Sequence, residues 1–164
     1  MSYDIITIGD AMRDIFIFPE VDEMEKPADY EQIRARVKFD KYLVFGLGDK
    51  ITVSDVEFSI GGTAANVACG LAKLGFKTGI ISALGNDNAG NEVKEKIGAA
   101  KVDTSLITVY KNHKTSFSVI ISYKGERTIF VYHAYSPDSF KLASRIKSNW
   151  LYLGPMGKGF EKLF

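Results

Sequence analysis

The apolar positions of the chain fall into short runs separated by glycine-rich turns, and two segments have helical spacing. The run Tyr3–Ile8 is rich in isoleucine and ends at Gly9-Asp10, as a buried strand ends at the carboxyl edge of a parallel sheet. Small and apolar residues recur at helical spacing from Gly62 to Leu74, and Gly75 follows as a C-terminal cap would. This pattern predicts a buried strand and an amphipathic helix.

The same alternation of strand and helix continues along the chain. Lys77–Leu84 is a second buried run, and a polar turn leads from it into a helical pattern through Val93 and Ile97 that ends at Gly98. A further strand is expected at Trp150–Leu153. Strands that alternate with helices predict a parallel sheet with right-handed crossovers, and therefore an α/β fold.

Two other regions have the β-prone pattern of hairpins. Tyr42–Phe45 and Ile51–Phe58 flank one glycine-rich turn, and Thr115–Tyr123 and Arg127–Tyr132 flank another that contains Gly125. Hairpins cannot belong to the parallel sheet, so we expect them to pair as a small second sheet over its carboxyl edge, where α/β proteins bind ligands. The arrangement predicts a base and a lid.

Other segments complete this division of the chain. Residues 20–40 are rich in charge, contain Pro27 and directly follow Pro19, which predicts a solvated insertion with a short helix at about 30–37. Residues 137–147 are polar and compatible with a helix. The segments assigned to the lid are approximately 15–18, 42–60 and 115–134.

Composition and charge exclude several classes of protein. The chain has 164 residues, of which 46% are hydrophobic and 25% charged, the balance of a globular protein with a real core. The net charge is +1 and no block of like charge occurs, which argues against a nucleic-acid partner. No run of 18 apolar residues indicates a membrane span, and no signal sequence is recognisable. With its single Cys69, the chain is expected to be cytoplasmic.

Candidate chemistry gathers around the first predicted helix. Gly61 and Gly62 precede it, which lets a ligand approach the backbone and leaves first-turn N–H groups free to donate to oxygen atoms. Asn66, one turn inside, can both donate to and accept from a hydroxyl. The Asp14 carboxylate can accept two hydrogen bonds from hydroxyls, as a polyol site requires. The alternatives are a tight turn with a helix-surface asparagine, and a loop cap or surface ion pair for Asp10 and Asp14.

Other motifs are less informative. The stretch from Gly154 to Gly159 has the wrong spacing for a phosphate-binding loop and lacks a Ser or Thr after its lysine. His113 and His133 have no ligands at metal-binding spacing, so a role on the hairpin surface is favoured. Cys69 lies among small helical residues and is expected to be a packing residue.

Four motifs together resemble the ribokinase, or PfkB-type, carbohydrate kinase family. They are ITIGDAMRD from Ile6, GGTAANVACGLAKLG from Gly61, GIISALGNDNAGNEV from Gly79 and TSFSVIISYKGERTIFVYHAYS from Thr115. The resemblance implies a ribokinase-like α/β fold with a β-sheet lid, and a kinase that uses ATP and magnesium to phosphorylate a hydroxymethyl group of a sugar, nucleoside or related polyol. It also implies a homodimer formed through the lid.

The resemblance also implies roles for particular residues. The family's substrate-binding positions match Asp14, Gly61, Gly62 and Asn66, and lid residues that line the pocket match Ser118 and Phe130. The family's second half carries a D-T-x-G-A-G-D loop with the catalytic base and an N-x-x-E motif associated with magnesium, and neither pattern occurs up to Phe164. We therefore expect this chain to be the amino-terminal part of such a kinase, inactive alone, with its base beyond Phe164. The alternatives are a non-catalytic sugar-binding or dimerising module and an unrelated Rossmann-like domain.

Overall fold

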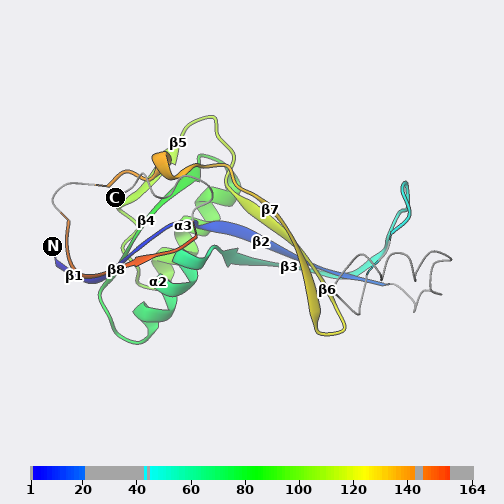
Figure 1. Cartoon of the computed structure of the whole chain (residues 1–164), viewed down its shortest axis with the longest axis horizontal. Coiled ribbons are helices and arrows are strands. Elements are labelled where there is room, and N and C mark those ends of the chain that lie inside the picture. Colours follow the sequence, from blue (N-terminus) through cyan, green and yellow to red (C-terminus); the bar gives the residue numbers. More distant parts are fainter. Residues whose placement is uncertain (1, 21–42, 44, 143–145, 156–164) are drawn as a thin grey trace, which may run out of the picture.

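The structure, a computed structural model, describes residues 2–20, 43, 45–142 and 146–155, and its strands form two four-stranded sheets. The first sheet is wholly parallel and has the order β5-β4-β1-β8. Its strands are β1 (Ser2–Ile8), β4 (Thr78–Gly85), β5 (Ile107–Tyr110) and β8 (Lys147–Leu153). Figure 1 shows this sheet beside the second sheet, which extends from it to the right. The predicted parallel sheet is confirmed, and the short edge strand β5 was not predicted.

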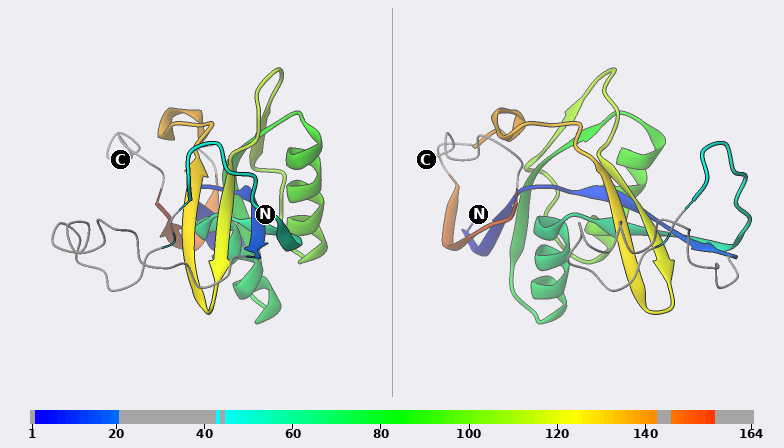
Figure 2. Two further views of the ribbon diagram at one scale, coloured as in Figure 1. Left: turned by 90° about the vertical axis from the view of Figure 1, so that its right-hand side faces the viewer. Right: turned by 45° about the vertical axis from the view of Figure 1, so that its right-hand side comes forward.

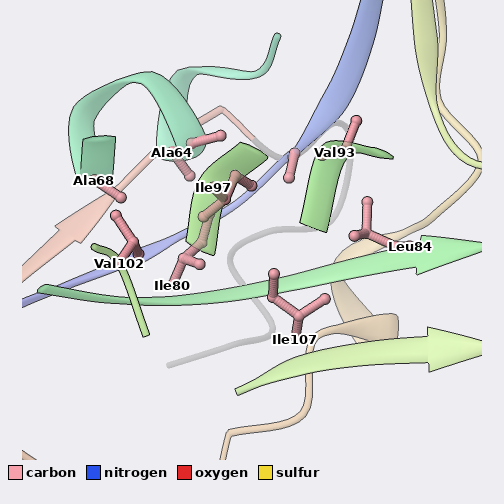
Figure 3. Packing of buried hydrophobic residues seen from close by; sticks show 10 residues of the cluster. Ala64, Ala68, Ile80, Leu84, Val93, Ile97, Val102 and Ile107 are labelled. Carbon is pink, nitrogen blue, oxygen red and sulfur yellow. The ribbon is translucent and has the colours of Figure 1, made fainter. Parts of the chain in front are cut away.

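Two helices cover one face of the parallel sheet. Helix α2 (Thr63–Lys73) joins the second sheet to β4, and helix α3 (Asn88–Ala99) joins β4 to β5. Small alanines on α2 allow that helix to lie close to the sheet, while larger aliphatic residues of α3 fill the space beside them (Figure 3). The buried residues of this core are Ala11, Ala64, Ala65, Ala68, Ile80, Leu84, Val93, Ile97, Val102 and Ile107.

The opposite face of the sheet is covered by the segment that follows the second sheet. Alternate residues of β1 and β4 point to this side, where Tyr135 and Phe140 pack on them. The only helical element of that segment within the described residues is a 3-10 turn, Pro137–Ser139. Of the predicted helix-compatible stretch, residues 140–142 and 146 are in neither helix nor strand, Lys147 already belongs to β8, and 143–145 lie outside the described residues.

The second sheet has the order β3-β2-β6-β7 (Figure 2). Its strands are β2 (Met12–Pro19), β3 (Val53–Gly61), β6 (Phe117–Tyr123) and β7 (Glu126–Tyr132). The predicted hairpin of β6 and β7 is confirmed. The other predicted hairpin needs correction, because β3 pairs antiparallel with β2. Residues 43 and 45 belong to no strand, and 42 and 44 lie outside the described residues. The two regions join through β2, which also pairs parallel with β6.

The register gives the second sheet two distinct faces, because registered partners and alternate residues share a face. Asp14 is registered with both Ser59 and Ser118, whereas Ile15 is registered with Phe58 on the other side. We call the first side the Asp14 face; its members include Asp14, Ser59, Gly61, Ser118, Ile129 and Val131. We call the second side the Phe58 face; its members include Ile15, Val56, Phe58, Phe117, Phe130 and Tyr132.

Two remaining predictions concern the insertion at residues 20–40 and membrane-spanning helices. The insertion at residues 20–40, with its short helix, lies outside the described residues apart from Glu20. Among the helices that are described, none is long and apolar enough to span a membrane.

Candidate functional site

The Asp14 carboxylate is held where β2, β3 and β6 come together near the parallel sheet. The Ser118 hydroxyl donates to Asp14 Oδ1 at 2.5 Å, and Ser118 is only 2% exposed. A Cβ on Gly61 would lie 2.1 Å from the same Oδ1, so only glycine leaves room for the carboxylate there. Asp14 itself is half-buried, so it remains accessible to a ligand. The structure therefore brings together Asp14, Gly61 and Ser118, as the sequence predicted.

Gly62 fixes the approach of α2 to the end of β1. It has φ +90°, in the region that favours glycine, and a Cβ there would lie 2.2 Å from the carbonyl oxygen of Asp10. The helix begins without a side-chain cap, so its first-turn N–H groups have no partner of that kind. Asn66 lies one turn further, where its N–H donates to the Gly62 carbonyl at 3.0 Å and its side chain is exposed. The amide is thus free of the core and lies near the same end of the helix.

Asp10 was not expected to be paired inside the protein. Its carboxylate is 9% exposed, and its Oδ2 lies 3.0 Å from Nδ1 of His133, whose side chain is 47% exposed. Burial raises the pKa of Asp10, and the charge and hydrogen bond of His133 partly offset that rise. His133 is exposed, as its predicted surface role requires, and its pairing with the buried Asp10 carboxylate is an additional contact. Asp10 and His133 are far apart in sequence, and no local pattern could have indicated the contact.

A third polar cluster joins the end of β4 to the segment leading into β6. The Thr115 hydroxyl accepts from the Gly85 N–H at 3.0 Å and donates to Asp87 Oδ1 at 2.6 Å. The N–H groups of Thr115 and Gly90 donate to the same carboxylate, so Asp87 also caps α3. Burial acts to raise the pKa of Asp87, but these hydrogen bonds outweigh it and the net pKa is lowered. The cluster holds the start of β6 at a defined place on the parallel sheet.

One predicted site residue does not join this group. Phe130 is registered with Val119, which in turn is registered with Ile15, so its side chain stands on the Phe58 face and is 59% exposed. The period of two along a strand accounts for this placement, because a shift of one position moves a side chain to the other face. Val131, the next residue, is the one that β7 places across from Ser118.

His113 and Cys69 have the surface and packing positions that the sequence favoured for them. The ring of His113 stacks with Tyr135 and lies close to Tyr110. Cys69, a residue of α2, packs against the core, and burial raises the pKa of its thiol, partly offset by the charge of Lys73. Within the part of the chain that the structure describes, no group of three His, Cys, Asp or Glu side chains could hold a metal ion.

Comparison with known proteins agrees with this geometry. The model of the pfkB family of carbohydrate kinases matches residues 21–155. A fructokinase of Salmonella typhimurium is 39% identical over 69 residues, which are 42% of this chain and 22% of that protein. Matches of this kind place the chain with sugar kinases, of which it spans only a part.

Solved structures show the same fold. A ribokinase of Cryptococcus neoformans in complex with ADP has a TM-score of 0.64 and 22% identity, covering 92% of this chain and 42% of that one. An Arabidopsis thaliana ribokinase complexed with ribose and ATP has a TM-score of 0.59 and 22% identity, covering 80% and 36%. This chain therefore spans about two fifths of the solved proteins that it matches. With a ribokinase-like α/β fold and a family match over most of its length, it belongs to the pfkB family of carbohydrate kinases.

Proposed function

We propose that the whole protein phosphorylates a hydroxymethyl group of a sugar, nucleoside or related polyol at the expense of ATP, and that this chain binds the acceptor. The main support for the proposal is the Asp14 carboxylate near the carboxyl edge of the parallel sheet. Gly61 leaves room for this carboxylate, and the Ser118 hydroxyl donates to it and orients it. Ligands of open α/β sheets bind at this edge, where the strand order reverses. Here the order reverses at β1, since β4 and β8 flank it on opposite sides.

The chemistry of the group suits a polyhydroxylated ligand. Ser118 occupies one position on Asp14 Oδ1, which leaves the other carboxylate oxygen to accept hydrogen bonds from hydroxyls. The exposed Asn66 amide can donate to or accept from a neighbouring hydroxyl. The glycine pair allows the ligand to approach the backbone at the start of α2. These groups bind and orient an acceptor, and none of them is proposed to take its proton.

The nucleotide and its magnesium ion would be bound mainly outside this chain. The matched ribokinases were solved with ATP or ADP, and the family relationship supports the same cofactor here. The described residues offer no cluster of ligands that fits a magnesium ion. The family's D-T-x-G-A-G-D and N-x-x-E motifs do not occur up to Phe164, and we assign the general base and the neutralisation of the transferring phosphoryl group to residues beyond it. The single cysteine is the ground on which we propose a cytoplasmic protein.

We also propose that two copies associate through the Phe58 face. Five apolar or aromatic side chains on this face are each more than a third exposed: Val56, Phe58, Phe117, Phe130 and Tyr132. Arg13 lies over the Phe58 ring at 4.2 Å and also pairs with Glu92 of α3, which fixes one end of the surface. An apolar face on a flat sheet gains stability when a symmetric partner covers it.

The test uses the protein that the whole gene encodes, with a panel of sugars, sugar acids and nucleosides as acceptors and ATP as donor. Asp14→Asn should lower kcat/KM for the best acceptor by about 10²–10³-fold, because charge-assisted hydrogen bonds contribute about 1.5–3 kcal/mol each. ATP affinity should change less than twofold. Asp55→Asn is the matched control, since Asp55 lies on the exposed part of β3 and accepts from the Val56 N–H.

Each outcome has a clear meaning. Selective loss of acceptor turnover in Asp14→Asn supports the proposal. An equal loss of ATP binding would mean that Asp14 supports the fold and does not bind the acceptor. Acceptor binding without phosphate transfer, in the unmodified whole protein, would instead favour the non-catalytic sugar-binding module.

A further inference from the structure

Asp10 lies at the point of the parallel sheet where a ligand is expected. It follows the end of β1, the strand at which the order of the sheet reverses. Its main chain packs against Gly62 at the start of α2, because a Cβ on Gly62 would lie 2.2 Å from the Asp10 carbonyl oxygen. The buried carboxylate therefore lies at the same edge as the glycine pair, and its pairing with His133 is not explained by the binding group described above.

The position of His133 directs its ring to the Asp14 face. Tyr132 ends β7 with its side chain on the Phe58 face, where its ring lies 5.5 Å from that of Phe117. Alternation along the strand turns the next side chain to the other face, on the same side as Val131. The contact between His133 Nδ1 and Asp10 Oδ2 agrees with this direction. The next N–H, that of Ala134, donates to the buried Ser116 hydroxyl at 3.0 Å and fixes the backbone beside the ring.

The pairing determines which nitrogen of the ring is free. A carboxylate accepts from Nδ1–H, so the proton of neutral His133 is held on Nδ1 and Nε2 carries the lone pair. The ring is half exposed while the carboxylate is buried, so the ring can reach a ligand that Asp10 cannot. Neutral Nε2 accepts a hydrogen bond and protonated Nε2 donates one. A hydroxyl group can serve as the partner in both states.

We infer that His133, oriented by Asp10, hydrogen-bonds through Nε2 to a hydroxyl of the acceptor and so contributes to acceptor specificity. This inference rests on the proposed function and extends its binding group from β2, β3 and α2 to the end of β7. Asp10 is a positioning residue, because it acts through the ring of His133. The acceptor class that this arrangement favours has a free hydroxyl on the side facing the second sheet.

The kinetic test uses the whole protein and two matched histidine variants. His133→Phe keeps an aromatic ring but removes Nε2, so KM for the acceptor should rise roughly five- to tenfold, as expected for one hydrogen bond, while kcat and KM for ATP change less than twofold. His113→Phe is the control, since its ring stacks with Tyr135 outside this group and all three constants should stay unchanged. A deoxy analogue that lacks the contacted hydroxyl should bind both the unmodified protein and His133→Phe equally.

A spectroscopic measurement tests the role of Asp10 without relying on turnover. Long-range proton–nitrogen NMR spectra of the imidazoles, assigned by loss of the His133 signals in His133→Phe, should show the Nδ1–H form for neutral His133. Asp10→Asn should remove that preference. Added acceptor should shift Nε2 of His133 and leave His113 unchanged.

The outcomes separate this inference from the proposed function. If the protein phosphorylates its acceptor but His133→Phe leaves the acceptor KM within twofold, or Nε2 does not respond to the acceptor, the inference is overturned and the proposed function stands. If the unmodified protein phosphorylates no acceptor, both are overturned.

Discussion

The two faces of the second sheet carry different chemistry although the same strands build both. On β3 the alternation is nearly complete, with Asp55, Glu57 and Ser59 on the Asp14 face, and apolar Val56 and Phe58 opposite them. The Asp14 face holds its polar group beside the parallel sheet, whereas the Phe58 face is an exposed aromatic surface. One period of two along the chain can therefore encode the proposed ligand site and the proposed association surface together.

The largest expected effect is on self-association, which should depend on the Phe58 face and not on the Asp14 face. Phe130→Ser should weaken self-association by roughly 10²–10⁴-fold, because burial of a phenylalanine contributes about 1.5–3 kcal/mol and a symmetric dimer loses it twice. Ile129→Ser changes the neighbouring residue of β7 on the Asp14 face and should leave the oligomeric state unchanged. Sedimentation equilibrium of the whole protein measures both. Equal behaviour of the two variants would contradict the assignment of the association surface.

A second substitution, at Gly61, changes the space beside the Asp14 carboxylate. Gly61→Ala places a Cβ against the Asp14 carboxylate, so the carboxylate must leave Ser118 or the strand must shift. Acceptor affinity should fall roughly 10- to 100-fold, and the free energy of unfolding should fall by about 1–3 kcal/mol. Gly70→Ala is the matched control, because open space surrounds that position of α2 and the helix should gain up to about 1 kcal/mol. Calorimetry with the acceptor and urea unfolding measure the two effects.

A smaller effect is expected when the carboxylate remains but loses its orienting hydroxyl. Ser118→Ala removes the donor to Asp14 Oδ1, so KM for the acceptor should rise about five- to tenfold with little change in kcat. Ser122→Ala, further along the same strand, should have no effect. A fall in kcat without a rise in KM would show that Ser118 serves the chemical step and not the placement of Asp14.

The smallest effect concerns the cluster that anchors both faces at the start of β6. The folded pKa of Asp87 is lowered, so its stabilising contribution is complete above the unfolded value of about 3.9 and is lost as pH falls through the folded value. Between about pH 5 and pH 2, the unmodified protein should therefore lose stability more steeply than Asp87→Asn. Thr115→Val, which removes the hydroxyl that Asp87 binds, should reduce the slope in part. Urea unfolding across this pH range checks the order of the three slopes.

The fold was predictable where the signal is local. The helical period before Gly75 and the apolar run ending at Leu84 predicted α2 and β4, because each element buries one continuous stretch of chain. The central place of β2 was not predictable, since its partners β3 and β6 lie far along the chain and register is set by pairing, not by local sequence.

The site divides in the same way. Gly61, Gly62 and Asn66 stand together in one motif, and the family resemblance added Asp14 and Ser118, which the structure brings into contact across two strands. The contact of Asp10 with His133 could not be predicted from the sequence, because no local pattern indicates that residues at the ends of two different strands are neighbours. Phe130 lies on the Phe58 face, away from Asp14, because it stands one position before Val131 along β7.

The most direct test of the central claim is a crystal structure of the whole protein with the acceptor that it phosphorylates fastest. Acceptor hydroxyl oxygens should lie at hydrogen-bond distance, about 2.6–3.2 Å, from the Asp14 carboxylate and the Asn66 amide, on the Asp14 face of the second sheet. An acceptor bound on the Phe58 face, or one that leaves Asp14 without a contact, would contradict it.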